Sequence, residues 1–106
     1  MKEKNDYGMY SGAFIFDVLD RHALKYIKAQ AGLSKKAVLV TQQSGVIFKR
    51  QLCQKKYSVL CHSYNAVIRY HSSLYFCRVG MYDPDHNLIA DANFMFALAT
   101  NHCEVK

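Results

Sequence analysis

One stretch near the N-terminus, Gly12–Ala31, restricts the possible folds more than any other part of the chain. Its apolar residues recur at the spacing of an α-helix: Ile15, Leu19, Ala23 and Ile27, with Phe16, Val18 and Leu24 beside them. Ser11 before the stretch is a good N-cap residue, and Gly32 after it is a good helix stop. Because so many large apolar groups do not suit a surface, the sequence predicts a long buried helix.

Only strands are predicted after this helix. Alternating apolar patterns occupy residues 37–43, 46–48, 57–69, 74–82 and 88–98. Ser44-Gly45 suggests a bend or bulge between the first two, and residues 83–87 are a dense turn signal. In the last strand one face carries Leu88, Ala90, Ala92, Phe94, Phe96 and Leu98. That face should lie on the helix, with the two alanines allowing close approach, so we expect an α+β fold in which an antiparallel sheet wraps around one helix.

The chain is 106 residues long, which suits one domain, 1–106, with a single small core. No run approaches the roughly 20 apolar residues of a membrane span. The first residues show no signal-peptide pattern, so we expect a cytoplasmic location. The net charge of +6 suits nucleic acid, an anionic membrane surface or a polyanionic small molecule, but Lys and Arg are scattered in ones and twos. Charge alone therefore selects no partner.

The cysteines do not indicate a metal site. Four of them, Cys53, Cys61, Cys77 and Cys103, are too widely spaced for a CxxC motif. Without a secretory signal we expect reduced thiols in or near the core. Cys61-His62 and His102-Cys103 are neighbouring pairs, and neighbours on a strand point to opposite faces, so neither pair readily offers two ligands to one metal. We expect no metal.

Three segments resemble the hotdog-fold acyl-CoA thioesterases of the 4-hydroxybenzoyl-CoA and phenylacetate type. Residues 11–20 are similar to the helix start of that family, in which a His-Gly-Gly-type turn precedes the central helix and an acidic residue lies further along it. Residues 40–50 are similar to its second and third strand region, and residues 79–90 to its last hairpin. The resemblance implies a hotdog fold: an antiparallel sheet wrapped around one long central helix, here with a first strand that is at most a stub.

The same resemblance implies a catalytic site on the helix. Gly12 and Ala13 stand at the paired-glycine position, and Asp20 stands at the acidic position. Thioester hydrolysis needs donors that polarise the carbonyl and a carboxylate that attacks or activates water, which are the roles implied for these residues. Ser11 replaces the family's histidine, and Ala13 replaces its second glycine. Ser11 is better explained as a cap than as a nucleophile, because no convincing Ser-His-Asp set can be proposed.

Spacing along the helix predicts a site shared by two protomers. Asp20 lies about 12 Å from Gly12 along the axis, at roughly 1.5 Å per residue. One carbonyl cannot touch both from the same chain, whereas an antiparallel partner helix would bring its own aspartate to this N-terminus. We therefore expect a homodimer or a dimer of dimers. No cofactor is expected beyond coenzyme A as part of the substrate, and its phosphates would meet Lys49, Arg50 and Arg78.

Two further candidate residues also have explanations that need no role in catalysis. Asp17 is best explained as the ion-pair partner of Arg21, four residues on. Thr41 would line an acyl pocket, or it reflects only the preference of threonine for strands.

The leading hypothesis is an acyl-CoA thioesterase of lipid metabolism that hydrolyses a fatty or aromatic acyl thioester. The alternative is a non-catalytic acyl-CoA-binding or sensor module on the same fold; the missing histidine favours it and Asp20 favours the enzyme. A dehydratase is disfavoured because no convincing His and Glu motif is present. Nucleic-acid binding is disfavoured too: no RNA-binding motif accompanies the tyrosines that would stack bases, Tyr57, Tyr64, Tyr70 and Tyr75.

Overall fold

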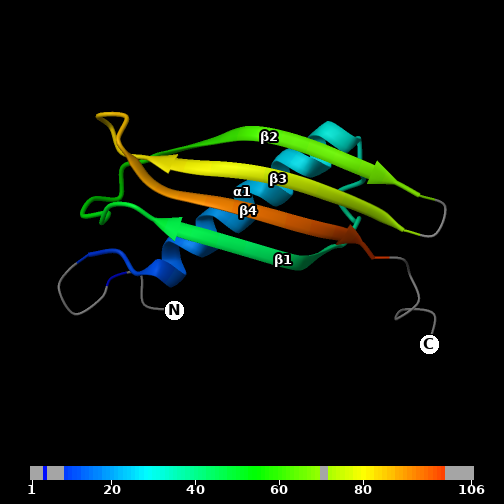
Figure 1. Cartoon of the computed structure of the whole chain (residues 1–106), viewed down its shortest axis with the longest axis horizontal. Helices are drawn as coiled ribbons and strands as arrows, with labels where there is room; N and C mark the ends of the chain where they lie inside the picture. The colour runs from blue at the N-terminus through cyan, green and yellow to red at the C-terminus, as the bar shows by residue number, and fades with distance from the viewer. Residues whose placement is uncertain (1–3, 5–8, 70–71, 100–106) are drawn as a thin grey trace.

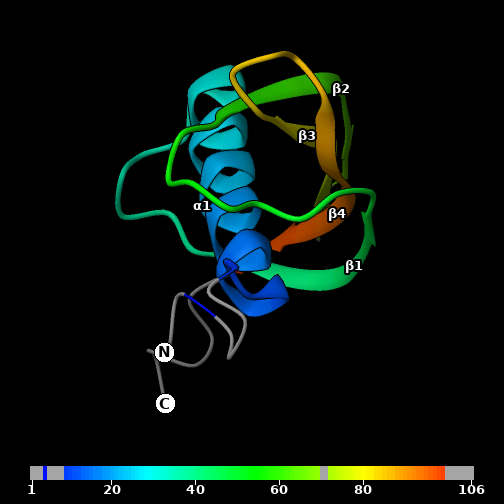
Figure 2. The same ribbon diagram turned by 90° about the vertical axis from the view of Figure 1, so that its left-hand side faces the viewer.

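The computed structural model describes Lys4 and residues 9–69 and 72–99. Helix α1 spans Gly12–Ala31, and four strands follow it: β1 Leu39–Phe48, β2 Ser58–Ile68, β3 Ser73–Tyr82 and β4 Leu88–Leu98. The strands form one antiparallel sheet in the order β1-β4-β3-β2 (Figure 1). Figure 2 shows the sheet curving around one side of α1. The predicted architecture, one long helix held against an antiparallel sheet, is confirmed.

Both predicted ends of α1 are confirmed. The Ser11 hydroxyl accepts a hydrogen bond from the Phe14 N–H at 3.1 Å and so caps the first turn. At the other end Gly32 has a φ of 66°, and its N–H donates to the carbonyl of Ala29. A side chain at this left-handed position would cost about 1 kcal/mol, which explains the glycine.

The core lies between α1 and the two central strands, β3 and β4. Leu19, Ala23 and Ile27 are completely buried on the helix. They face the buried side of the sheet, which carries Tyr75, Cys77, Val79, Met81, Ala90, Ala92, Phe94 and Phe96. The two alanines are fully buried, as expected for positions where the helix comes close. Together these side chains form one continuous hydrophobic core.

The strand β1 differs from the prediction. It is continuous, and its irregularity lies at Gln42 rather than at Ser44-Gly45. The extra residue has a physical reason: it shifts the alternation, so that Leu39 before it and Val46 after it both face the helix. A similar irregularity at His62 does the same for β2.

The loop that joins β1 to β2 folds back over the start of the helix. Leu52 in its middle is only 2% exposed, and its carbonyl accepts a hydrogen bond from the Tyr10 N–H at 2.9 Å. The loop is also held by the N–H groups of Lys49 and Arg50, which both donate to the carbonyl of Ile89. These contacts fix the basic residues of the loop beside the N-terminus of α1.

The cysteines occupy different environments. Cys77 is buried and Cys61 half-buried, both as free thiols with their sulfur atoms 3.4 Å apart, whereas Cys53 is exposed. Cys103 lies outside the described residues. In the described part of the chain, no helix is long and apolar enough to cross a membrane.

Truncation of Leu19 should reveal how far the fold depends on α1. Leu19→Ala removes a completely buried side chain and leaves a cavity, so we expect the free energy of unfolding to fall by about 3 kcal/mol. Urea denaturation followed by circular dichroism measures the loss. Gln30→Ala, at an exposed position of the same helix, is the control and should change stability by less than about 0.5 kcal/mol. Equal effects of the two changes would mean that α1 is not the centre of the core.

Candidate active site

Two hydrogen-bond donors stand open at the start of α1. Gly12 and Ala13 are the first two helical residues and are exposed. The next two N–H groups are already used, because Phe14 donates to the Ser11 hydroxyl and Ile15 to the Ser11 carbonyl. Among the described residues, the N–H groups of Gly12 and Ala13 have no acceptor. With the positive end of the helix dipole behind them, they can bind a carbonyl oxygen or an oxyanion.

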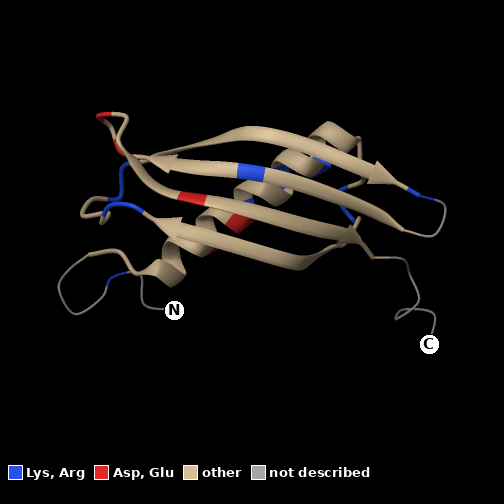
Figure 3. Cartoon of the chain, in the orientation of Figure 1, with Lys and Arg blue, Asp and Glu red and all other residues tan. Residues whose placement is uncertain are grey.

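The end of β1 covers one side of these donors. A Cβ atom placed on Gly12 would lie 3.3 Å from the tip of the Phe48 ring. Phe48 itself is 50% exposed to solvent. Lys49 and Arg50 follow directly, and both are exposed. Figure 3 shows Lys and Arg residues gathered in the loop after β1. Phe48 is not among the site residues predicted from the sequence; the only sequence signal for it is a large aromatic residue at the end of a strand, directly before two cations.

Asp20 lies further along α1, on the side of the helix that faces β1. It is half-buried, and the Thr41 hydroxyl donates to its Oδ1 at 3.4 Å. Burial raises the pKa of the Asp20 carboxyl above its ordinary value of 3.8; the Thr41 hydrogen bond works against this, and the nearby Asp17 charge adds to it. A carboxylate with a raised pKa is a better base for water. The contact also gives Thr41 a role that its sequence position left undecided.

Asp17 is occupied elsewhere. Its carboxylate forms an ion pair with the guanidinium of Arg21, one turn on, as predicted. This pair is on the surface of the helix, away from Thr41. Of the two aspartates on α1, only Asp20 therefore combines burial with a polar partner from the sheet.

The three predicted phosphate-binding cations are not brought together. Lys49 and Arg50 lie near the start of α1, but Arg78 lies on the sheet face that points away from the helix, since its neighbours Cys77 and Val79 are buried on the helix side. Its guanidinium donates to the Asp91 carboxylate at 2.6 and 3.1 Å, and the two residues lie on the neighbouring strands β3 and β4. The role of all three cations in binding coenzyme A stays a prediction.

The tyrosines proposed for base stacking do not form an open platform. Tyr75 is 3% exposed in the core, and the ring of Tyr64 packs edge-on against Tyr26 at 5.9 Å. Tyr57 is half-buried, and Tyr70 lies outside the described residues. In the part of the chain that the structure describes, no three side chains of His, Cys, Asp or Glu lie close enough to hold a metal.

The raised pKa of Asp20 gives a pH dependence of defined sign. The folded protein holds this proton more tightly than the unfolded chain, so the stability associated with it is full below pH 3.8 and is lost as the pH rises through the folded pKa. As the pH rises through the folded pKa of Asp20, we expect wild type to lose stability relative to Asp20→Asn. Melting temperatures of both proteins, measured from pH 3 to 7, test this expectation.

A control with the opposite sign is available in the turn before β4. Hydrogen bonds from the backbone N–H groups of Asn87 and Asp85 lower the pKa of Asp83, so its contribution is present above pH 3.8 and lost as the pH falls. Wild type should therefore lose stability relative to Asp83→Asn on acidification. A pH-independent difference between wild type and Asp20→Asn would refute the raised pKa.

The fold is similar to several solved structures. A protein from Bacillus halodurans with coenzyme A superposes with a TM-score of 0.74 and 13% identity over 92% of this chain, which spans 61% of that protein. A hypothetical thioesterase from Streptococcus pneumoniae with coenzyme A gives 0.67 and 17% identity over 92% of this chain and 72% of the other. Zebrafish thioesterase superfamily member 2 gives 0.70 and 14% identity over 92% and 67% of the two chains.

No protein-family model matches the chain, and no curated protein matches its sequence. At identities of 13 to 17% the similarity extends to the fold alone. One helix against a four-stranded antiparallel sheet, shared with thioesterase structures across more than nine tenths of the chain, confirms the fold that the sequence resemblance implied. The chain has the hotdog fold.

Proposed function

We propose that this protein is an acyl-CoA thioesterase that hydrolyses a fatty or aromatic acyl thioester at a site shared by two protomers. The observation that carries the proposal is the half-buried Asp20, with its raised pKa, on the same helix as two N–H donors that have no acceptor among the described residues. The similarity to thioesterase structures, including one with coenzyme A bound, supports it. The cytoplasmic location and the role in lipid metabolism stay predictions.

Each group has one chemical role in this mechanism. The N–H groups of Gly12 and Ala13 bind the thioester carbonyl oxygen and stabilise the negative charge that develops on it. Asp20 takes a proton from a water molecule while the water oxygen attacks the carbonyl carbon. When the carbon–sulfur bond breaks, the same carboxyl returns the proton to the sulfur, which leaves a free acid and a thiol. Attack by the Asp20 carboxylate itself is the other route, and it passes through an anhydride that water then hydrolyses.

The open edge of β1 supports a two-protomer arrangement. Among the described residues β1 pairs only with β4, so its other side is an unpaired edge. It carries Val40, Ile47 and Phe48, which are 44, 57 and 50% exposed. Long edge strands with exposed apolar side chains tend to pair with another strand. A second copy of β1 would continue the sheet and bury these residues.

Antiparallel pairing of two β1 strands would also complete the site. If the two-fold axis passes at Gly45, Thr41 lies opposite the partner subunit's Phe48, with Gln42 counted as the extra residue of the bulge. Both residues face the helix side of the sheet, as opposite residues must. Because Thr41 contacts Asp20 and Phe48 contacts Gly12, this pairing brings each Asp20 toward the partner's open N–H groups.

The basic loop after β1 suits the nucleotide part of coenzyme A. Lys49 and Arg50 follow Phe48, so they would lie beside the donors that hold the thioester, and they are exposed to solvent. Arg78 would meet a phosphate only on the other face of the sheet, where it binds Asp91. We therefore propose Lys49 and Arg50 as the main phosphate contacts.

The second candidate is a module that binds acyl-CoA without hydrolysing it. Ser11, whose hydroxyl is committed to the Phe14 N–H, stands where the family has a histidine. Such a module would bind coenzyme A in calorimetry and show no turnover with any acyl chain.

Hydrolysis of a panel of acyl-CoAs is the direct test. With acetyl, octanoyl, palmitoyl and benzoyl substrates, release of the thiol is measured for wild type, Asp20→Asn and Asp17→Asn. Loss of the general base should lower kcat by about 100-fold or more in Asp20→Asn. Asp17→Asn is the matched control on the same helix and should keep most of the activity. Equal losses in the two variants would remove Asp20 from the mechanism.

Mixing two inactive variants tests the shared site. Ala13→Pro removes one donor N–H in the first turn of α1, where proline is tolerated. Each variant alone should be inactive, but a mixed dimer of Ala13→Pro and Asp20→Asn has one site with both groups intact. Random exchange of subunits should restore about a quarter of wild-type activity. Native mass spectrometry shows whether the subunits have exchanged. If they have exchanged and no activity is recovered, each site lies within one chain.

A further inference from the structure

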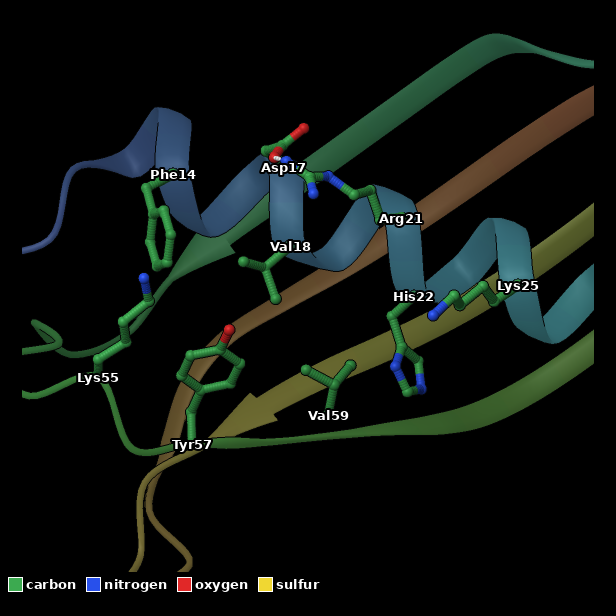
Figure 4. Close-up of a pocket in the computed structure, with 9 residues that line it drawn as sticks. All are labelled: Phe14, Asp17, Val18, Arg21, His22, Lys25, Lys55, Tyr57 and Val59. Carbon is green, nitrogen blue, oxygen red and sulfur yellow. Dashed lines mark hydrogen bonds and ion pairs between the residues drawn. The ribbon is translucent and has the colours of Figure 1, made fainter. Parts of the chain in front are cut away.

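A separate groove lies on the other side of α1 from Asp20. It has a volume of about 710 Å³ and runs between the helix and the segment that leads into β2. Val18, His22 and Lys25 line it from the helix, and Tyr57 and Val59 line it from the β2 side (Figure 4). Since β2 and β1 are opposite edges of the sheet, this groove lies away from Asp20 and its partner Thr41.

Helix geometry confirms the separation. Successive residues turn by about 100° around a helix of 3.6 residues per turn, so Asp20 points roughly 200° away from Val18 and from His22. Asp20 contacts Thr41 of β1, whereas Val18 and His22 line the groove on the β2 side. A ligand in the groove would therefore not touch the Asp20 carboxylate of the same chain.

The groove has an apolar floor and a positively charged rim. Phe14, Val18 and Val59 supply apolar surface. The cations around them are Arg21, Lys25 and Lys55, and the one carboxylate in the lining, Asp17, is paired with Arg21. The ammonium of Lys55 lies 5.6 Å from the centre of the Phe14 ring, so a cation is held directly beside the apolar floor.

Two further polar groups add hydrogen-bonding capacity. Figure 4 shows the Tyr57 hydroxyl pointing toward α1 beside Val18, and the His22 ring directed toward β2. Neither the Tyr57 hydroxyl nor the His22 ring has a hydrogen-bond partner among the described residues. The Tyr57 hydroxyl and the Lys25 ammonium both line the groove, so an anionic ligand has hydroxyl and ammonium donors available there.

We propose that this groove binds an amphipathic anion, an acid head group on an apolar body. The charge of the rim selects an anionic head over a neutral or cationic one. The apolar floor selects a hydrocarbon or aromatic body over a simple inorganic anion. The volume is within the range of small-molecule sites, about 300 to 1,000 Å³. The proposal does not depend on thioester hydrolysis.

Binding of four octyl compounds to the full chain tests it. Octanoate and octyl phosphate carry the two acid heads, octanol is neutral and octylammonium is cationic. Calorimetry in low salt should show that one or both acids bind and that octanol and octylammonium bind at least about tenfold more weakly. The acid with the higher affinity identifies the preferred head group. Affinity should fall as salt is added, since the rim is exposed to solvent. Equal binding of octanol and the acids, or no binding of either acid, would overturn the proposal.

Charge-reversal variants test whether the ligand binds in the groove. Lys25→Glu, at an exposed position that leaves the core untouched, should weaken binding of the better acid by about tenfold. Lys36→Glu makes the same charge change at an exposed turn outside the groove and should leave affinity unchanged. Asp20→Asn should also bind like wild type, which distinguishes this site from a product bound at the proposed catalytic centre. Equal weakening by Lys25→Glu and Lys36→Glu would show that net charge, not the groove, holds the ligand.

Discussion

The burial of one apolar side of α1 against β3 and β4 is the interaction on which the remaining structure depends. Leu19, Ala23 and Ile27 are inaccessible to solvent, and the small Ala90 and Ala92 let the helix lie close to the sheet. Hydrophobic burial of this kind is the main favourable term in folding, and it fixes the helix rotation as well as its position. Once the rotation is fixed, Asp20 must face β1 and the opposite side of the helix must face β2. The candidate site and the groove are thus two consequences of one packing arrangement.

The irregularity at Gln42 places Thr41 beside Asp20. A regular β1 would keep only one end of its apolar pattern on the helix, because side chains alternate between faces. The extra residue lets Leu39, Thr41, Val46 and Phe48 share the helix side, as their pairing with β4 shows. This arrangement gives Asp20 a hydroxyl partner at one end of β1 and gives Gly12 an aromatic neighbour at the other.

Local signals in the sequence were sufficient for the helix, its caps and the strands, whereas the hotdog fold was implied by the family resemblance. Ser11 and Gly32 act through their immediate neighbours, and the apolar spacing of α1 reports its buried side directly. Features that depend on distant residues were not predictable in this way. The bulge was predicted at Ser44-Gly45 but lies at Gln42, because both ends of β1 must face the helix. This requirement depends on how β1 pairs with β4 and cannot be read from β1 alone. Arg78 was grouped with Lys49 and Arg50 by charge, but strand alternation places it on the other face with Asp91.

The loop between β1 and β2 joins the two sides of the molecule. It begins with Lys49 and Arg50 beside the helix N-terminus, passes through the buried Leu52, and ends with Lys55 and Tyr57 in the groove. Leu52 is therefore a fixed point shared by both ends. A substitution that removed this anchor would therefore disturb the helix N-terminus and the groove together. Through the nine residues of this loop, one buried side chain supports two faces of one helix.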